Sequence, residues 1–205
     1  MLGSPRVSRS VLLLEDTRLP SWLVLFRGTI SLVQVLGDTT ADSPLDPIFQ
    51  HSARRWAMCH PRCFEASPDQ RALDELQTLL RSNVSDGEAL TAYDHAVAEL
   101  RGQFHAFAVN PPASRDISDV FIWIFELLDD FFPLLKIPTQ EAVVIVTYFA
   151  ILLKKLDSIC WMEGWADYLV SWAQNLLDAN HQPWISWPLA EIERIGHAFE
   201  DKKAP

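Results

Sequence analysis

The sequence contains little cysteine, little glycine and no long hydrophobic run. Its three cysteines, Cys59, Cys63 and Cys160, are an odd number without a disulfide framework, which favours a reducing compartment, the nucleus or the cytoplasm. The longest uncharged apolar run covers residues 142–153, and a membrane-spanning helix needs roughly 20 such residues. We therefore expect no membrane span.

Basic residues are also in short supply. The chain has 17 lysines and arginines against 27 aspartates and glutamates, a formal net charge of -10. Proteins bind the phosphate backbone of nucleic acids mainly through clustered lysine and arginine, which displace counterions. An acidic chain of this kind is repelled by that backbone, so we expect no direct binding to nucleic acid.

The remaining composition is that of a helical protein. Hydrophobic residues make up 49% of the chain, and most of the 13 prolines fall between apolar segments with helical periodicity. We expect an all-α fold, a single compact bundle of about seven to eight helices around a buried apolar helix. Residues 17–200 would form this domain, after a loosely ordered segment of residues 1–16 and before a charged tail of residues 201–205.

Helix starts and apolar spacing locate the individual elements. Ser67 followed by Pro68 predicts one helix start, Ser85 with Glu88 forms a capping-box pattern, and Thr139 can cap a third helix. The segment 143–153 is apolar nearly all round, which is typical of a helix at the centre of a bundle. The expected helices cover about residues 21–36, 48–58, 68–80, 85–107, 116–128, 140–156 and 161–176, with a last one starting at Pro188.

Five of the eight tryptophans lie between residues 161 and 187. Large residues at intervals of three and four predict an aromatic stripe on one helix, made of Trp161, Trp165, Tyr168, Leu169, Trp172 and Leu176. Such a stripe forms either a bulky core, which is the more frequent case, or the wall of an apolar pocket. Gly164 would lie inside this helix, where glycine costs about 1 kcal/mol relative to alanine. Its presence indicates helix packing or the close approach of a ligand.

Several strings in this order resemble the regulatory region that follows the binuclear zinc-cluster DNA-binding domain of fungal transcription factors. The subgroup typified by sterol uptake control proteins is the most similar, and the resemblance covers most of residues 20–195. The strings are Trp22-Leu-Val-Leu-Phe-Arg-Gly28, Tyr93-Asp-His-Ala-Val-Ala-Glu-Leu-Arg101, Val120-Phe-Ile-Trp123, Glu141-Ala-Val-Val-Ile-Val-Thr-Tyr-Phe-Ala150, and residues 161–166 followed by 184–188.

The resemblance implies an α-helical effector and activation domain. In the sterol-sensing members a hydrophobic pocket near the C-terminal helices takes a sterol. If the helices pack as in that family, ten residues here are candidates for lining such a pocket, and part of the set is expected to be plain core. They are Trp22, Phe26, Phe121, Phe125, Tyr148, Leu152, Trp161, Gly164, Trp165 and Tyr168.

The sequence departs from the family in two respects, and one is that the helices that usually precede the Trp22 string are missing. The DNA-binding module of these regulators needs six closely spaced cysteines, and here only Cys59 and Cys63 lie near one another. We expect either a fragment of a longer regulator or a short protein that descends from the regulatory domain and has another use.

Two motifs with metal-binding residue types are weak. Cys59-His-Pro-Arg-Cys63 offers three ligands, whereas a structural zinc site needs four and no partner cluster exists. Asp129-Asp130 resembles part of the aspartate-rich motif of terpene synthases, but Pro133 stands where a further acid belongs. We expect no metal and no cofactor, with the two aspartates simply ending a helix.

His95 and Glu99 lie one helical turn apart, a spacing that an acid-base pair could use. Tyr93, Val97 and Leu100 already define a different, inward face, so a solvated pair is expected. No nucleophile elbow, phosphate-binding loop or dinucleotide motif is present. The sequence therefore identifies no catalytic residue.

Three functions fit these observations. The first is a regulatory domain that binds a hydrophobic, sterol- or terpenoid-like molecule in an aromatic-lined pocket. The alternative is a stand-alone pocket enzyme of fungal secondary metabolism, a cyclase or pericyclase of Diels-Alderase type, which needs only shape and exclusion of water. The third is an interaction module whose partner is a second copy of the chain or another regulator.

Overall fold

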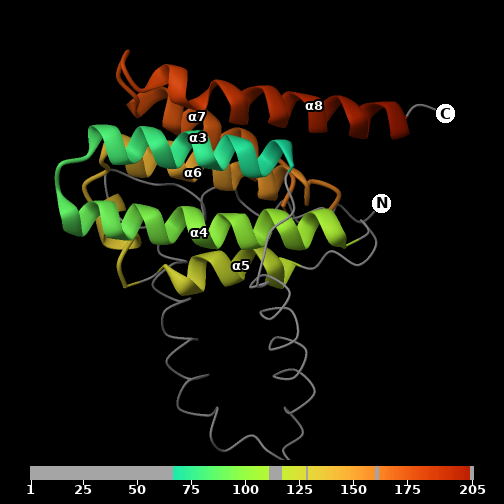
Figure 1. The fold of residues 1–205 in the computed structure, drawn as a ribbon. Helices are drawn as coiled ribbons and strands as arrows, with labels where there is room; N and C mark the ends of the chain where they lie inside the picture. Colours follow the sequence, from blue (N-terminus) through green and yellow to red (C-terminus); the bar gives the residue numbers. More distant parts are fainter. Residues whose placement is uncertain (1–66, 111–116, 128, 160–161, 204–205) are drawn as a thin grey trace, which may run out of the picture.

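The fold was analysed in a computed structural model, which describes residues 67–110, 117–127, 129–159 and 162–203. Helices α3 and α4 form an antiparallel pair, and α5 runs alongside α4 (Figure 1). The described elements, labelled as in Figure 1, are α3 (Pro68–Asn83), α4 (Gly87–Val109), α5 (Ile117–Glu126), the 3-10 helix η3 (Phe132–Leu135), α6 (Gln140–Lys154), α7 (Trp165–Leu176), the 3-10 helix η4 (Gln182–Ile185) and α8 (Ser186–Lys203).

This part of the chain is helical and has no strand, which confirms the all-α class for the described residues. It contains six α-helices, so the expected count of seven to eight is not confirmed. The helices predicted over residues 21–36 and 48–58 lie outside the described residues, as does the segment 1–16. None of the described helices is both long and apolar enough to cross a membrane.

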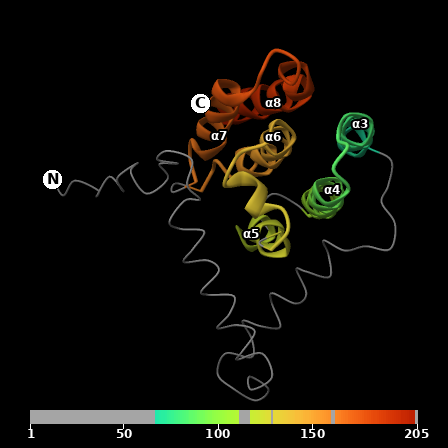
Figure 2. The same ribbon diagram turned by 90° about the vertical axis from the view of Figure 1, so that its left-hand side faces the viewer.

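Helix α6 is the centre of the bundle, as its sequence predicts. It packs against α4, α7 and α8, and in Figure 2 it lies among these helices and α5. Every residue from Ala142 to Leu153 is buried. The buried hydroxyl of Thr147 donates to the carbonyl of Val144 in the same helix at 2.6 Å. It therefore does not remain unsatisfied in the core.

Two of the three predicted caps are correct. The Ser67 hydroxyl accepts from the Gln70 amide, and the Thr139 hydroxyl accepts from the Ala142 amide. The third is wrong by one residue, because α4 is capped by Asp86 and not by Ser85. The Asp86 carboxylate accepts from the amides of Glu88 and Ala89, and an ionised acceptor also interacts favourably with the positive end of the helix dipole.

The last helix begins at Ser186, two residues before the predicted start at Pro188. Proline is tolerated in the first turn of a helix, where the backbone N–H has no partner within the helix. Pro188 therefore lies inside the first turn and does not mark its beginning.

Trp123 of α5 joins three parts of the core. Its ring stacks on Phe149 of α6 with the ring centres 4.3 Å apart, and it meets Phe131 and Phe132 edge to face. Its indole N–H donates to the carbonyl of Ala96 in α4 at 3.0 Å. Trp123 is 1% exposed, so this side chain ties α5 to both α4 and α6.

The prediction that Gly164 lies inside the aromatic helix is wrong. Helix α7 begins at Trp165, and Gly164 precedes it with φ of +83°. An added Cβ at Gly164 would meet nothing within 4 Å, so glycine is not required there by a close neighbour. It is required by the left-handed backbone, which glycine adopts without the steric cost that other residues incur.

Replacing Gly164 by alanine is expected to lower the free energy of unfolding by about 1–2 kcal/mol, because the Cβ disfavours the left-handed conformation. Gly87→Ala is the matched control, since a Cβ there also meets nothing within 4 Å. That change, in the first turn of α4, is expected to stabilise by up to about 1 kcal/mol. The measurement is urea unfolding of both variants. Equal effects at the two positions would contradict the backbone explanation.

Candidate functional site

Helix α7 turns small residues toward the core. Ala166 and Ala173 are fully buried, and they lie seven residues apart, so they share one face of the helix. The helix packs mainly against α6. Because alanine has only a methyl side chain, it allows the two helices to approach closely.

The aromatic residues of α7 lie along one edge of this alanine face. Together with two leucines they form what we call the α7 stripe: Trp165, Tyr168, Leu169, Trp172 and Leu176. Trp165, Leu169 and Trp172 pack against the core while staying partly exposed, Tyr168 is partly buried, and Leu176 is 40% exposed. The stripe predicted from the sequence therefore exists from Trp165 onward. It is not the inward face of the helix, and Trp161 lies outside the described residues.

Two other predicted pocket residues, Tyr148 and Leu152 of α6, are buried, with 4% and 0% of their surface exposed. The Tyr148 hydroxyl donates to the carbonyl of Trp184 at 3.3 Å, and its ring lies 5.4 Å from that of Trp187. Burial raises the pKa of the Tyr148 hydroxyl, so it stays neutral. Trp187 in turn meets Phe104 of α4 at 6.3 Å. Tyr148 thus packs toward α8.

The remaining predicted residues that the structure describes lie on different elements. Phe125 lies on α5 and is 36% exposed. Phe121 belongs to the same helix, and Gly164 immediately precedes the stripe. Trp22 and Phe26 lie outside the described residues. Among the described candidates, the structure brings Trp165 and Tyr168 together on α7 and leaves Tyr148 and Leu152 together on α6.

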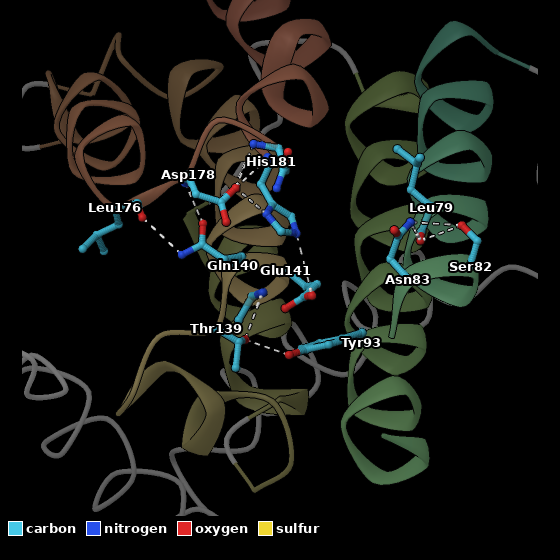
Figure 3. Close-up of polar contacts among 12 residues, drawn as sticks. Leu79, Ser82, Asn83, Tyr93, Thr139, Gln140, Glu141, Leu176, Asp178 and His181 are labelled. Carbon is cyan, nitrogen blue, oxygen red and sulfur yellow. Dashed lines mark hydrogen bonds and ion pairs between the residues drawn. The ribbon is translucent and has the colours of Figure 1, made fainter. Parts of the chain in front are cut away.

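A polar network fixes the C-terminal end of α7 onto the beginning of α6. Gln140 donates from its amide to the carbonyl of Leu176 at 3.2 Å and accepts from the backbone N–H of Asp178 at 2.8 Å (Figure 3). Nearby, the Tyr93 hydroxyl of α4 and the Thr139 hydroxyl are 2.7 Å apart. The network therefore connects α4, α6 and the segment that follows α7.

His181 is the central titratable group of this region. Its Nδ1 lies 2.8 Å from the Asp178 carboxylate, and its Nε2 lies 3.8 Å from the Glu141 carboxylate (Figure 3). The hydrogen bond from His181 lowers the pKa of Asp178, helped by the backbone amides of His181 and Asn180. The ring of His181 also contacts that of Trp184, with 4.8 Å between centres.

Sequence reasoning missed this network. The spacing of Asp178 and His181 is a local signal, since residues three apart in a turn can pair. Gln140 and Glu141 follow the correctly predicted cap Thr139, but nothing local indicates that they face a segment almost 40 residues later. Pairing over that distance depends on how α6 and α7 pack.

The histidine–glutamate pair predicted from the sequence, His95 and Glu99, is part of a larger contact. His95 Nε2 lies 3.9 Å from Glu99, and His95 Nδ1 is also hydrogen-bonded to Asp130 at 2.5 Å. Asp130 accepts from the Phe131 amide as well. This contact fastens the segment after α5 to α4, and both Asp129 and Asp130 are exposed.

Within the described ranges, no group of three or more histidines, cysteines, aspartates or glutamates is placed to hold a metal ion. The Cys59 to Cys63 string lies outside those ranges. The candidate site is thus the α7 stripe, whose C-terminal end is held by a polar network. Comparison of the chain with protein-family models, with curated proteins and with solved structures gives no match.

Proposed function

We propose that this chain is a regulatory-type helical domain that binds a hydrophobic small molecule, sterol- or terpenoid-like, along the α7 stripe. In this proposal it is related to the regulatory region of fungal zinc-cluster transcription factors, acts in the nucleus or the cytoplasm, and does not itself bind DNA. The observation that carries the proposal is the division of α7 into a buried alanine face and a partly exposed aromatic edge.

This division leaves apolar surface of the stripe that the described core does not cover. Burying a large aromatic side chain contributes strongly to stability, so ordinary folds place such residues inward. Here α7 buries methyl groups and leaves two tryptophans, a tyrosine and two leucines at the boundary. Binding sites for small molecules are lined mostly by apolar and aromatic side chains, and the α7 stripe has that composition.

The residues that contact the ligand in this proposal differ from those first expected to line the pocket. Tyr148 packs toward α8 and Leu152 is fully buried in the core, so the proposed contact surface is restricted to the stripe. Polar groups flank the stripe at both ends: Lys154 of α6 pairs with Asp157 and Asp167 near its start, and the Gln140 network lies at the end of α7. A largely apolar molecule with polar groups at its ends matches this order.

The experiment is an anisotropy titration of dehydroergosterol, a fluorescent sterol, with the purified chain, and a competition with farnesol as an acyclic terpenoid. Saturable binding of either compound with recovery of unchanged ligand is the expected result. Absence of saturable binding for both would contradict the proposal. Conversion of a bound terpenoid into a product would overturn its regulatory part and favour the cyclase or pericyclase alternative.

A further inference from the structure

His181 bridges two segments of the chain that are far apart in sequence. Asp178 belongs to the connection between α7 and η4, and Glu141 belongs to the first turn of α6. We call His181, Asp178 and Glu141 the His181 bridge. The side chains of His181 and Glu141 are 17% and 21% exposed, and that of Asp178 is 50% exposed. The contact of His181 with Glu141 is therefore more protected from solvent than its contact with Asp178.

The bridge depends on the charge of the imidazole. A neutral imidazole carries one N–H, whereas the protonated ring donates from both nitrogens. If Nδ1–H donates to Asp178 in the neutral form, Nε2 turns a lone pair toward the Glu141 carboxylate. Protonation replaces that unfavourable contact by an ion pair across 3.8 Å.

The neighbouring groups that the structure describes supply no other positive charge to the two carboxylates of the bridge. In the described part of the chain, the ion pairs of Asp178 and Glu141 are both made with His181. From α4, the Tyr93 hydroxyl is electrostatically coupled to Glu141, but burial raises its pKa and keeps it neutral. From η4, the group against the ring is the uncharged indole of Trp184.

We infer that the His181 bridge is a proton-dependent fastening that holds the end of α7 on α6 and so sets the position of the α7 stripe. Protonation strengthens the fastening, and loss of the proton weakens it. The last two turns of α7 contain Trp172 and Leu176, and Gln140 bonds to the Leu176 carbonyl beside the bridge. The regulation of ligand affinity by this bridge rests on the proposed function, whereas the fastening itself does not.

The fastening is tested by a double-mutant cycle in urea with His181→Gln, Glu141→Gln and the double variant, at about pH 5.5 and about pH 8, the range in which histidine changes charge. The coupling between the two positions is expected to change the unfolding equilibrium constant by about two- to fivefold at the lower pH, as for partly exposed ion pairs, and to vanish or become unfavourable at the higher pH. Equal coupling at both pH values, or none at either, would overturn the inference.

The pH window separates this effect from that of Asp178. Because the pKa of Asp178 is lowered in the folded chain, its contribution to stability is present above its ordinary pKa and is lost only on further acidification. At about pH 5.5 and above, carboxylates of ordinary or lowered pKa remain largely ionised. Asp178 therefore carries the same charge at both points of the cycle.

The effect on the ligand is tested by dehydroergosterol affinity at the same two pH values. The unchanged chain is expected to bind about two- to fivefold more tightly at the lower pH, and His181→Gln to abolish this difference. His95→Gln is the matched control, because His95 also lies between two carboxylates but contacts the segment after α5. It is expected to keep the pH dependence of binding.

The outcomes distinguish the two proposals. A pH-dependent coupling without any saturable binding at either pH would contradict the proposed function and leave the fastening established. Binding whose pH dependence persists in His181→Gln, or is lost in His95→Gln, would overturn the regulatory role of the bridge.

Discussion

Trp123→Ala is expected to lower the free energy of unfolding by about 3–5 kcal/mol, the range for deleting a buried tryptophan. The indole is 1% exposed and stacks on Phe149, while Phe131 and Phe132 meet it edge to face. Truncation leaves a cavity between α5, α6 and the segment of Phe131 and Phe132. This cavity can close only if α5 moves. The measurement is equilibrium unfolding in urea, followed by circular dichroism.

Trp123→Phe is the matched control for this prediction. It keeps an aromatic ring on Phe149 and removes the hydrogen bond from the indole to the Ala96 carbonyl. Loss of one such bond and of part of the ring is expected to cost about 1–2 kcal/mol. A loss below about 1 kcal/mol for Trp123→Ala itself would contradict the position of Trp123 in the core, because surface changes have effects of that size.

The second large effect is expected at the contact between α6 and α7. Ala173→Leu should destabilise the fold by about 1–3 kcal/mol, since extra methylene groups in a filled core force side chains or backbone to shift. Ala173 is fully buried on the face that α7 turns to the core. The shift would displace the α7 stripe, so the affinity for dehydroergosterol should fall with stability.

Ala98→Leu is the control for added volume on a helix. Ala98 lies exposed on α4, where the same change is expected to alter stability by less than about 0.5 kcal/mol. Urea unfolding of both variants checks the prediction. Equal effects at the two alanines would show that α7 does not pack closely on α6, and the division of α7 into two faces would then be wrong.

Much of the fold follows from local sequence patterns. The continuous apolar run of α6 predicts a buried central helix, because no face of such a helix is suited to water. Ser67 and Thr139 are recognisable caps, since their hydroxyl groups can accept a bond from the first free amides of a helix. These features depend on neighbours within four residues, which the sequence displays directly.

The features that the sequence did not predict depend on partners from other helices. Spacing alone treats Trp165 and Ala166 as a large and a small apolar residue, so it places the tryptophan inward. In the structure the approach of α6 selects the alanine for the buried face. In the same way, nothing near Gly164 indicates that the helix starts only at Trp165, four residues after the predicted start. Nothing near Asp178 indicates that Gln140 and Glu141 lie opposite.

The resemblance to fungal regulators and the α7 stripe support the same proposed function by different routes. The first depends on five short strings, and the second on the exposure of α7 side chains. They differ in the residues they nominate, because Tyr148 and Leu152 are buried in the core. Variants of the stripe are therefore more informative about the ligand than variants of α6.

The most direct test of the central claim is the affinity of Trp172→Ala for dehydroergosterol, measured by the anisotropy of the sterol and compared with that of Ile137→Ala. Ile137 is 85% exposed and belongs to the segment between η3 and α6, outside the α7 stripe. If the stripe holds the ligand, Trp172→Ala weakens binding by about tenfold or more, as expected for loss of a large aromatic contact, and Ile137→Ala leaves it unchanged. Equal affinities for the two variants would contradict the claim that the α7 stripe is the binding site.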